Sequence, residues 1–88
     1  MPEIETTERF EKDFLRLPPE LQKKMLKALR LLAENPRHPS LQTKPIQGAP
    51  GLYEARIDLS YRLTFQRMPG DILLLRTAGK HDETLKKP

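Results

Sequence analysis

The chain has 88 residues, no cysteine and a formal net charge of +4 at pH 7. This length predicts one domain, residues 1–88, and the lack of cysteine excludes disulfides and a cysteine-bound zinc as supports for its core. No stretch approaches the roughly 18 apolar residues of a membrane span, and the acidic first residues lack the apolar run of a signal peptide. We therefore expect a soluble cytoplasmic protein with no membrane contact.

The first third of the sequence predicts a short strand followed by two helices. Residues 2–5 fit a strand at the edge of a sheet. Thr6–Thr7 can cap a helix that begins at Glu8, because a threonine side chain can accept a hydrogen bond from a free N–H of the first turn. Pro18–Pro19 ends this helix and begins a second one, which Asn35–Pro36 ends. The apolar residues that recur at helical spacing, and so form the inward side of the hairpin, are Phe10, Phe14, Leu17, Leu21, Met25, Ala28, Leu29 and Leu32.

Residues 36–51 predict a long loop. This segment holds four prolines, two glycines and no acidic residue. A loop of about 15 residues is unusual in a compact domain unless it has a function or is disordered. It is either a solvated connector or a functional loop that delivers His38 or Lys44 to the sheet.

The second half of the sequence predicts a three-strand antiparallel meander. Residues 53–57 and 61–65 alternate apolar and polar side chains, which is the period of half-buried strands. The apolar run Ile72–Leu75 predicts a central strand covered on both faces. With the helical hairpin on one face of this sheet, the fold class is α+β. We expect the tail, residues 83–88, to be a short solvated end that can include one helical turn.

Basic residues gather on the face of this sheet that the helices leave open. Residues 1–34 contain seven basic and seven acidic residues, so the whole positive excess lies in residues 35–88 and predicts an anionic partner. The alternation places Arg56 and Arg62 on the open face, with Arg76 near their level. His81 and Asp82 follow directly after the last strand.

Several kinds of site are excluded. The sequence has no glycine-rich phosphate loop and no Gly-x-Ser-x-Gly turn, and its two histidines lack metal-ligand spacing, so we expect no metal and no cofactor. A basic face with a histidine at its rim suits cleavage of a phosphodiester, because arginines can hold the phosphate and histidines titrate near neutral pH. Each arginine can instead be paired with Glu54 or Asp58, and His81 can be an ordinary loop residue.

Three segments resemble one known family. Leu-Tyr-Glu-Ala-Arg at 52–56, Ser-Tyr-Arg-Leu-Thr-Phe at 60–65 and Ile-Leu-Leu-Leu-Arg-Thr-Ala-Gly-Lys-His-Asp at 72–82 are similar to the RelE/ParE superfamily of type II toxin–antitoxin toxins, and the His-Asp pair to its YafQ branch. The resemblance implies a ribosome-dependent endoribonuclease that cuts messenger RNA in the ribosomal A site without a metal. It also implies a cognate antitoxin, possible assembly into a heterotetramer with it, and catalytic roles for Arg56, Arg62, His81 and Asp82. The residues expected to bind RNA are His38, Lys44, Arg76, Lys80, Lys86 and Lys87.

Two departures from the family pattern keep other functions open. Glu54 occupies a strand position where ribonuclease members often have a lysine, and the chain has no C-terminal aromatic residue. The alternatives are a DNA gyrase inhibitor of the ParE type and a degenerate toxin that only binds its antitoxin.

Overall fold

The computed structural model describes residues 1–88 as a five-stranded sheet with helices on both of its faces. The strands lie in the order β1-β5-β4-β3-β2, with β1 parallel to β5 and every other neighbouring pair antiparallel. The predicted α+β class and the edge position of the first strand are confirmed, and the sheet is mixed because of that strand. The elements are β1 (Glu3–Thr6), α1 (Glu8–Arg16), α2 (Pro19–Glu34), the 3₁₀ helix η1 (Pro39–Leu41), β2 (Lys44–Pro45), β3 (Leu52–Arg56), β4 (Tyr61–Met68), β5 (Ile72–Lys80) and α3 (His81–Lys86).

The helical hairpin begins with a capped helix, as the sequence predicts. The Thr7 hydroxyl accepts a hydrogen bond from the Phe10 N–H at 3.1 Å and thus satisfies one free donor of the first turn of α1. Beyond the end of β1, the Asp13 carboxylate of α1 accepts the Ala78 N–H of β5 at 3.1 Å. Helix α1 therefore continues along the edge of β5 where the short strand β1 has ended.

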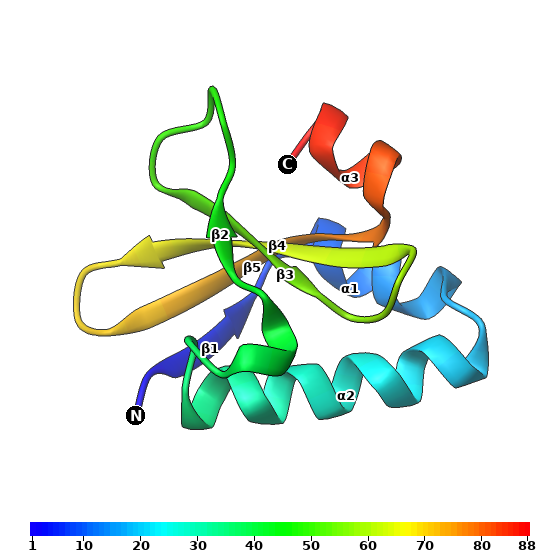
Figure 1. Ribbon diagram of the computed structural model, residues 1–88, viewed down its shortest axis with the longest axis horizontal. Coiled ribbons are helices and arrows are strands. Elements are labelled where there is room, and N and C mark those ends of the chain that lie inside the picture. Colours follow the sequence, from blue (N-terminus) through cyan, green and yellow to red (C-terminus); the bar gives the residue numbers. More distant parts are fainter.

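The apolar core lies between α2 and the sheet. Met25 and Leu32 of α2 and Leu63 and Phe65 of β4 are all fully buried. Figure 1 shows α2 along one face of the sheet and α3 beyond the opposite face. Burial of these side chains holds the sheet against α2. On the opposite face, α3 is the helix that contacts β4 and β5.

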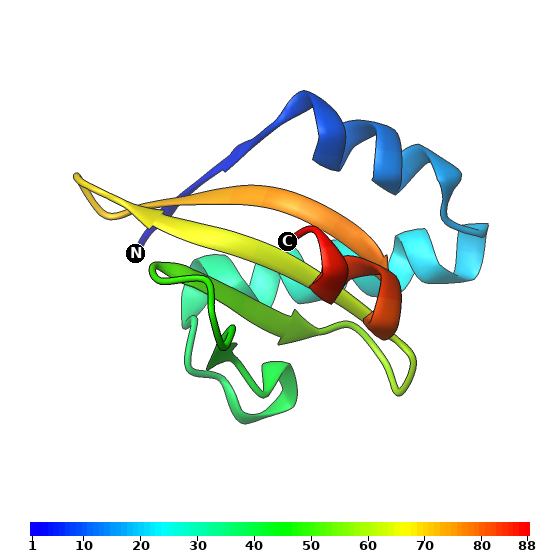
Figure 2. The same ribbon diagram turned by 90° about the horizontal axis from the view of Figure 1, so that it is seen from above.

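The C-terminal segment differs from the prediction of a solvated end. Residues 81–86 form helix α3, which lies back across β4 and β5 (Figure 2). Thr84 is 3% exposed, and its hydroxyl lies 3.2 Å from the Lys80 carbonyl oxygen and 3.1 Å from that of His81. The Arg76 Nε donates to the Pro88 carbonyl at 3.2 Å. The prediction was wrong because these contacts join the tail to the sheet and cannot be inferred from the tail's own polar composition.

The pairing of β4 with β5 contains one irregularity. Thr64 pairs with Thr77 and Phe65 with Leu75, so Arg76 is the extra residue of a β-bulge. Contrary to the prediction, the apolar run before the bulge is not covered equally on both faces. Leu73 and Leu75 are buried in the core, whereas Ile72 and Leu74 are only half-buried.

Candidate functional site

Three of the four residues predicted to be catalytic lie around the turn Asp58–Tyr61 at one end of the sheet. Arg56 on β3 is the cross-strand partner of Arg62 on β4, and Arg62 is the partner of Gly79 on β5. The His81 backbone N–H donates to the Ser60 carbonyl at 2.8 Å and thereby fixes the start of α3 to the same turn. We call Arg56, Arg62 and His81, with the adjacent Asp82, the sheet-end site.

Arg62 is engaged mainly with the protein itself. Its Nη1 donates to the carbonyls of Asp58 at 2.7 Å and Tyr61 at 3.0 Å, and more weakly to that of Leu59 at 3.3 Å. Its Nε lies 3.9 Å from the Glu54 carboxylate, and the side chain is 16% exposed. The alternative in which an arginine of this face is paired therefore holds for Arg62, which has little surface left for a substrate.

Glu54 is the carboxylate that pairs with an arginine of this site, as one alternative from the sequence had it. Its side chain is 5% exposed and lies between two cations, with Lys44 Nζ at 3.7 Å and Arg62 Nε at 3.9 Å. A carboxylate buried to this degree is costly unless cations or donors compensate it, and these two cations are its partners. Alternation along β3 was the signal that places Glu54 on this face with the arginines.

Asp58 connects the turn to helix α2. Its Oδ1 accepts the backbone N–H groups of Ser60 at 2.9 Å and Tyr61 at 2.8 Å, and its Oδ2 lies 3.4 Å from Lys24 Nζ. Burial raises the pKa of the Asp58 carboxyl, but the two N–H groups and the Lys24 ammonium outweigh burial and leave the pKa below its ordinary value. The turn is therefore held most firmly while Asp58 is ionised.

Arg56 is the arginine of the site without a carboxylate partner. It is half-exposed and forms no ion pair within 4.0 Å. It lines a hollow of about 230 Å³ at the open edge of β3, together with Lys24, Lys27 and Ser40. An incoming phosphate can therefore bind Arg56 without first breaking an ion pair.

His81 presents an accessible imidazole at the end of the sheet. Its side chain is 41% exposed, and Nδ1 lies 3.4 Å from the Asp82 carboxylate. That contact is long for a hydrogen bond, and the Asp82 side chain is 94% exposed, so Asp82 orients the ring only weakly. The backbone of His81 is fixed by its N–H bond to Ser60.

The residues predicted to bind RNA do not form one surface. Arg76 donates to Gln66 Oε1 at 3.0 Å beneath the C-terminal segment. Lys80 pairs with Tyr61 in register and lines a separate hollow with Asp13, Arg16 and Glu83, near the end of α1. Lys86 and Lys87 are exposed on α3 and just after it.

His38 and Lys44 lie together in the segment 36–45, which forms a hollow with β3 and β4. They line a hollow of about 300 Å³ with Arg37, Tyr53 and Arg67. The sequence pattern did not single out Arg37 or Arg67. Only the pairing of β3 with β4, which sets Tyr53 beside Phe65, brings Arg67 to this loop.

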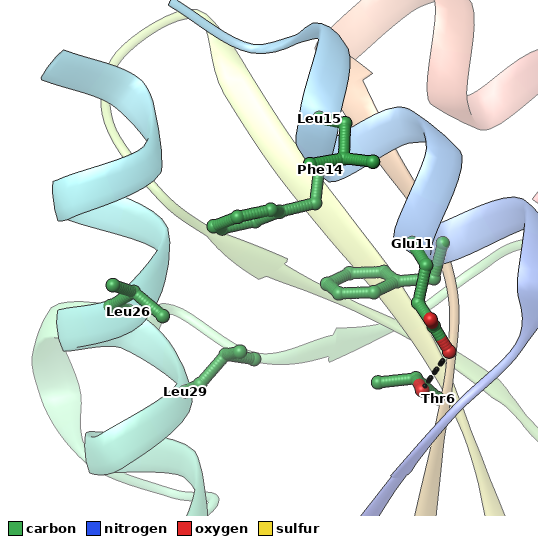
Figure 3. Close-up of a pocket in the computed structure, with 7 residues that line it drawn as sticks. Thr6, Glu11, Phe14, Leu15, Leu26 and Leu29 are labelled. Carbon is green, nitrogen blue, oxygen red and sulfur yellow. Dashed lines mark hydrogen bonds between the residues drawn. The ribbon is translucent and has the colours of Figure 1, made fainter. Parts of the chain in front are cut away.

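A groove between α1 and α2 is the most apolar hollow of the surface. Figure 3 shows Phe14 and Leu15 of α1 facing Leu26 and Leu29 of α2, with the hydrogen bond from Thr6 to Glu11, 2.7 Å long, at one end. The groove measures about 290 Å³, and Leu15 and Leu26 are 74% and 58% exposed. Exposed leucines on two adjacent helices are typical of a surface that binds another protein.

The structure also bears on metals and membranes. No group of three or more histidine, cysteine, aspartate or glutamate side chains is arranged to hold a metal ion. None of the helices has the length and apolar composition needed to cross a bilayer.

Comparison with known proteins relates both the sequence and the fold to one group. Residues 4–83 match the family model described as "ParE toxin of type II toxin-antitoxin system, parDE". A search of curated proteins finds no significant match.

Solved structures of toxins share the fold over nearly its whole length. The structure of YafQ from E. coli strain BL21(DE3) matches with a TM-score of 0.75 and 20% identity, covering 96% of this chain and 98% of that one. The intact E. coli RelBE toxin-antitoxin complex gives a TM-score of 0.72 at 23% identity, covering 91% and 96%. The YoeB/ParE toxin from Agrobacterium tumefaciens gives 0.75 at 18% identity, covering 90% and 98%. At these identities the likeness concerns the fold.

Proposed function

The chain belongs to the ParE toxin family, within the RelE/ParE superfamily of type II toxin–antitoxin systems. We propose that it is a ribosome-dependent endoribonuclease that cuts messenger RNA, a proposal supported by its site residues and by a fold shared with YafQ and RelE. One observation carries the proposal. The backbone brings His81, which has an accessible imidazole, and Arg56, which has an unpaired guanidinium, to the same end of the sheet. An acid-base group and a free phosphate-binding cation are what metal-free RNA cleavage requires.

The proposed reaction is an attack of the 2′-hydroxyl on the neighbouring phosphate. A base takes the 2′-hydroxyl proton, the 2′-oxygen forms a bond to phosphorus, and the bond from phosphorus to the 5′-oxygen breaks. An acid protonates the leaving 5′-oxygen, and the products carry a 2′,3′-cyclic phosphate and a 5′-hydroxyl. His81 serves as one of these two proton-transfer groups.

The remaining residues of the site have supporting roles. Arg56 stabilises the charge that grows on the phosphate, and Lys44, whose contact with Glu54 is long at 3.7 Å, can turn towards it. Arg62 positions the turn and the ionised Glu54, while Asp82 weakly orients His81. The predicted contacts of Arg76, Lys80, Lys86 and Lys87 with RNA remain predictions.

An antitoxin partner is part of the proposal. Solved structures with the same fold include the E. coli DinJ-YafQ and RelBE complexes. The groove between α1 and α2 fits the apolar side of a helix, and the exposed residues Lys23, Lys27 and Arg30 flank Leu26 on α2. The sequence alone favours the basic open face of the sheet as the surface that an acidic antitoxin covers. The groove adds an apolar surface with basic flanks, which complements a helical segment with an apolar stripe and acidic flanks, so we infer that the cognate antitoxin docks here instead, with a heterotetramer as a possible assembly.

The test is cleavage of messenger RNA in a purified translation reaction. The wild-type protein should cut only when ribosomes are present, and His81→Ala should lower the rate by about 10² to 10⁴. Lys12→Ala on α1, which lies outside the sheet-end site, is the control and should keep most of the activity. Wild-type cleavage by the His81→Ala protein would remove this histidine from the mechanism, and no cleavage by the wild-type protein would overturn the ribonuclease proposal.

A DNA gyrase inhibitor of the ParE type is the second candidate. The observation that favours it is the family match itself, which is to the ParE toxins, together with the internal pairing of Arg62. Expression of such an inhibitor should leave DNA breaks and intact messages in cells. A degenerate toxin that only binds its antitoxin should produce neither effect.

A further inference from the structure

The hollow between residues 36–45 and the sheet contains a stack of three flat groups that rises from the core to the surface. Phe65 is fully buried, and the Tyr53 ring lies on it with ring centroids 5.6 Å apart and an interplanar angle of 19°. The Arg67 guanidinium lies over the Tyr53 ring, with Cζ 5.1 Å from its centroid. Arg67 is exposed and forms no ion pair within 4.0 Å, so the stack ends in a planar cation that faces solvent.

The walls of this hollow carry positive charge and no carboxylate. Arg37, His38, Thr43 and Lys44 line it beside Tyr53 and Arg67, and no aspartate or glutamate is among its lining residues. The hollow is therefore suited to an anion. Its volume of about 300 Å³ leaves room for a group larger than a phosphate alone.

The loop that forms the wall has a defined structure. The Thr43 hydroxyl donates to the Pro36 carbonyl at 2.8 Å, and Leu41 is 1% exposed beneath the loop. The His38 Nδ1 accepts the Ser40 N–H at 3.1 Å, so the neutral ring carries its proton on Nε2. These contacts hold the wall of the hollow in a fixed shape.

We propose that this hollow binds one nucleotide of single-stranded RNA, with the base stacked on the Arg67 guanidinium and the phosphate held by Arg37 and Lys44. Guanidinium planes and aromatic rings are the usual stacking partners of unpaired bases, and stacking on a supported cation combines attraction for the base with attraction for the anionic backbone. The guanidinium is planar by resonance, and the Tyr53 and Phe65 rings beneath support it.

The location of the hollow gives this nucleotide a role in the proposed function, on which the inference rests. Lys44 lines the hollow and also contacts Glu54, which contacts Arg62 of the sheet-end site. A strand of RNA that crosses the edge strand β2 would place one base in the hollow and a phosphodiester further along the strand at His81, because Arg67 and the Ser60–His81 contact lie towards opposite ends of β4. Arg67 is then a specificity-determining residue that selects where the message is cut.

Binding of short, fluorescently labelled, 2′-O-methylated oligoribonucleotides tests the inference without cleavage, because the reacting hydroxyl is blocked. We compare an intact oligonucleotide with forms that lack one base at each position in turn. For the wild-type protein, loss of the base at one position should weaken binding on the order of 10-fold. Arg67→Lys keeps the positive charge but removes the planar guanidinium on which the base stacks. The affinity of this variant for intact RNA should therefore be as low as the affinity of the wild-type protein for RNA that lacks that base.

Arg67 is exposed, so its variants should fold, and Lys12→Ala on α1 is the matched control for a general loss of charge. Arg67→Lys and Lys12→Ala proteins with the same affinity for intact RNA would overturn the inference, as would wild-type affinity that is insensitive to every missing base. A wild-type protein that binds the bases as described but cuts no message would refute the ribonuclease proposal and leave the nucleotide site standing. If an acidic antitoxin peptide bound at the hollow and RNA did not, the hollow would be assigned to protein recognition instead.

Discussion

The Arg62 guanidinium donates a 2.7 Å hydrogen bond from Nη1 to the backbone carbonyl of Asp58, on the opposite side of the β3–β4 turn. The Asp58 carboxylate in turn accepts two N–H groups of the same turn and contacts Lys24 of α2. Three contacts therefore hold the turn that carries the sheet-end site: one from Arg62 of β4, one from Asp58 within the turn and one from Lys24 of α2. The first three predictions concern these supports.

Removal of the Asp58 carboxylate should destabilise the fold. Both backbone N–H groups bind Oδ1, so Asp58→Asn can keep these bonds and lose only the charge, whereas Asp58→Ala loses both. We expect a loss of about 2 kcal/mol in unfolding free energy for Asp58→Ala and less than about 1 kcal/mol for Asp58→Asn. Urea denaturation at neutral pH measures both values.

The stabilisation by Asp58 should depend on pH in a defined direction. Its pKa is lowered in the folded protein, so the unfolded state takes up a proton at higher pH and the stabilisation is lost as pH falls through the folded value. The difference between wild-type and Asp58→Asn proteins should be full above the ordinary aspartate pKa of about 3.9 and should shrink at lower pH. A difference that stays constant across that range would show that the charge of Asp58 contributes nothing.

Loss of Arg62 should act through Glu54. Arg62→Ala leaves a carboxylate with 5% exposure facing only Lys44, and we expect a loss of about 3 kcal/mol in stability. Adding Glu54→Gln should recover part of this loss, because the uncompensated charge is removed. If Arg62→Ala melts at the wild-type temperature while cleavage falls, Arg62 contacts the substrate and does not serve as a support.

Arg56 should contribute to RNA binding in a salt-dependent manner. Arg56→Ala should weaken binding of single-stranded RNA and reduce the slope of log affinity against log salt by about 0.7 for each phosphate that Arg56 neutralises in the wild-type complex. Lys12, paired with Glu8 at 3.1 Å on α1, is the control residue, and Lys12→Ala should change the slope little. Filter binding or fluorescence anisotropy over a series of salt concentrations measures both slopes, and equal slopes for the two variants would exclude binding of a phosphate by Arg56.

The groove between α1 and α2 should be required for antitoxin binding. Leu26→Glu places a charge at an exposed apolar position and should weaken the antitoxin complex on the order of 10-fold or more, with the fold unchanged. Leu59 is also exposed, at 80%, but lies in the β3–β4 turn, so Leu59→Ser is the control. Calorimetry with the purified antitoxin gives both affinities, and a larger loss for Leu59→Ser would move the docking surface to the sheet end.

Local patterns in the sequence were sufficient for most of the fold. The Thr7 cap, the Pro18–Pro19 pair and the alternation along β3 and β4 each act over a few residues, and the structure has helices and strands where these patterns predict them. They also placed Arg56, Arg62 and His81 at one end of the sheet, because antiparallel neighbours joined by a short turn bring their ends together.

The state of each charged group was decided only by the tertiary structure. Whether an arginine is free or paired depends on which carboxylates and carbonyls the topology brings to it, and so Arg62 is held by the turn while Arg56 remains unpaired. The return of α3 over the sheet and the stacking of Arg67 on Tyr53 likewise depend on contacts between separate strands and segments. The sequence by itself determined the elements, through hydrogen bonds and periodicity within a few residues. Only the packed structure determined which side chains reach solvent, because burial and ion pairing arise between residues that are distant along the chain.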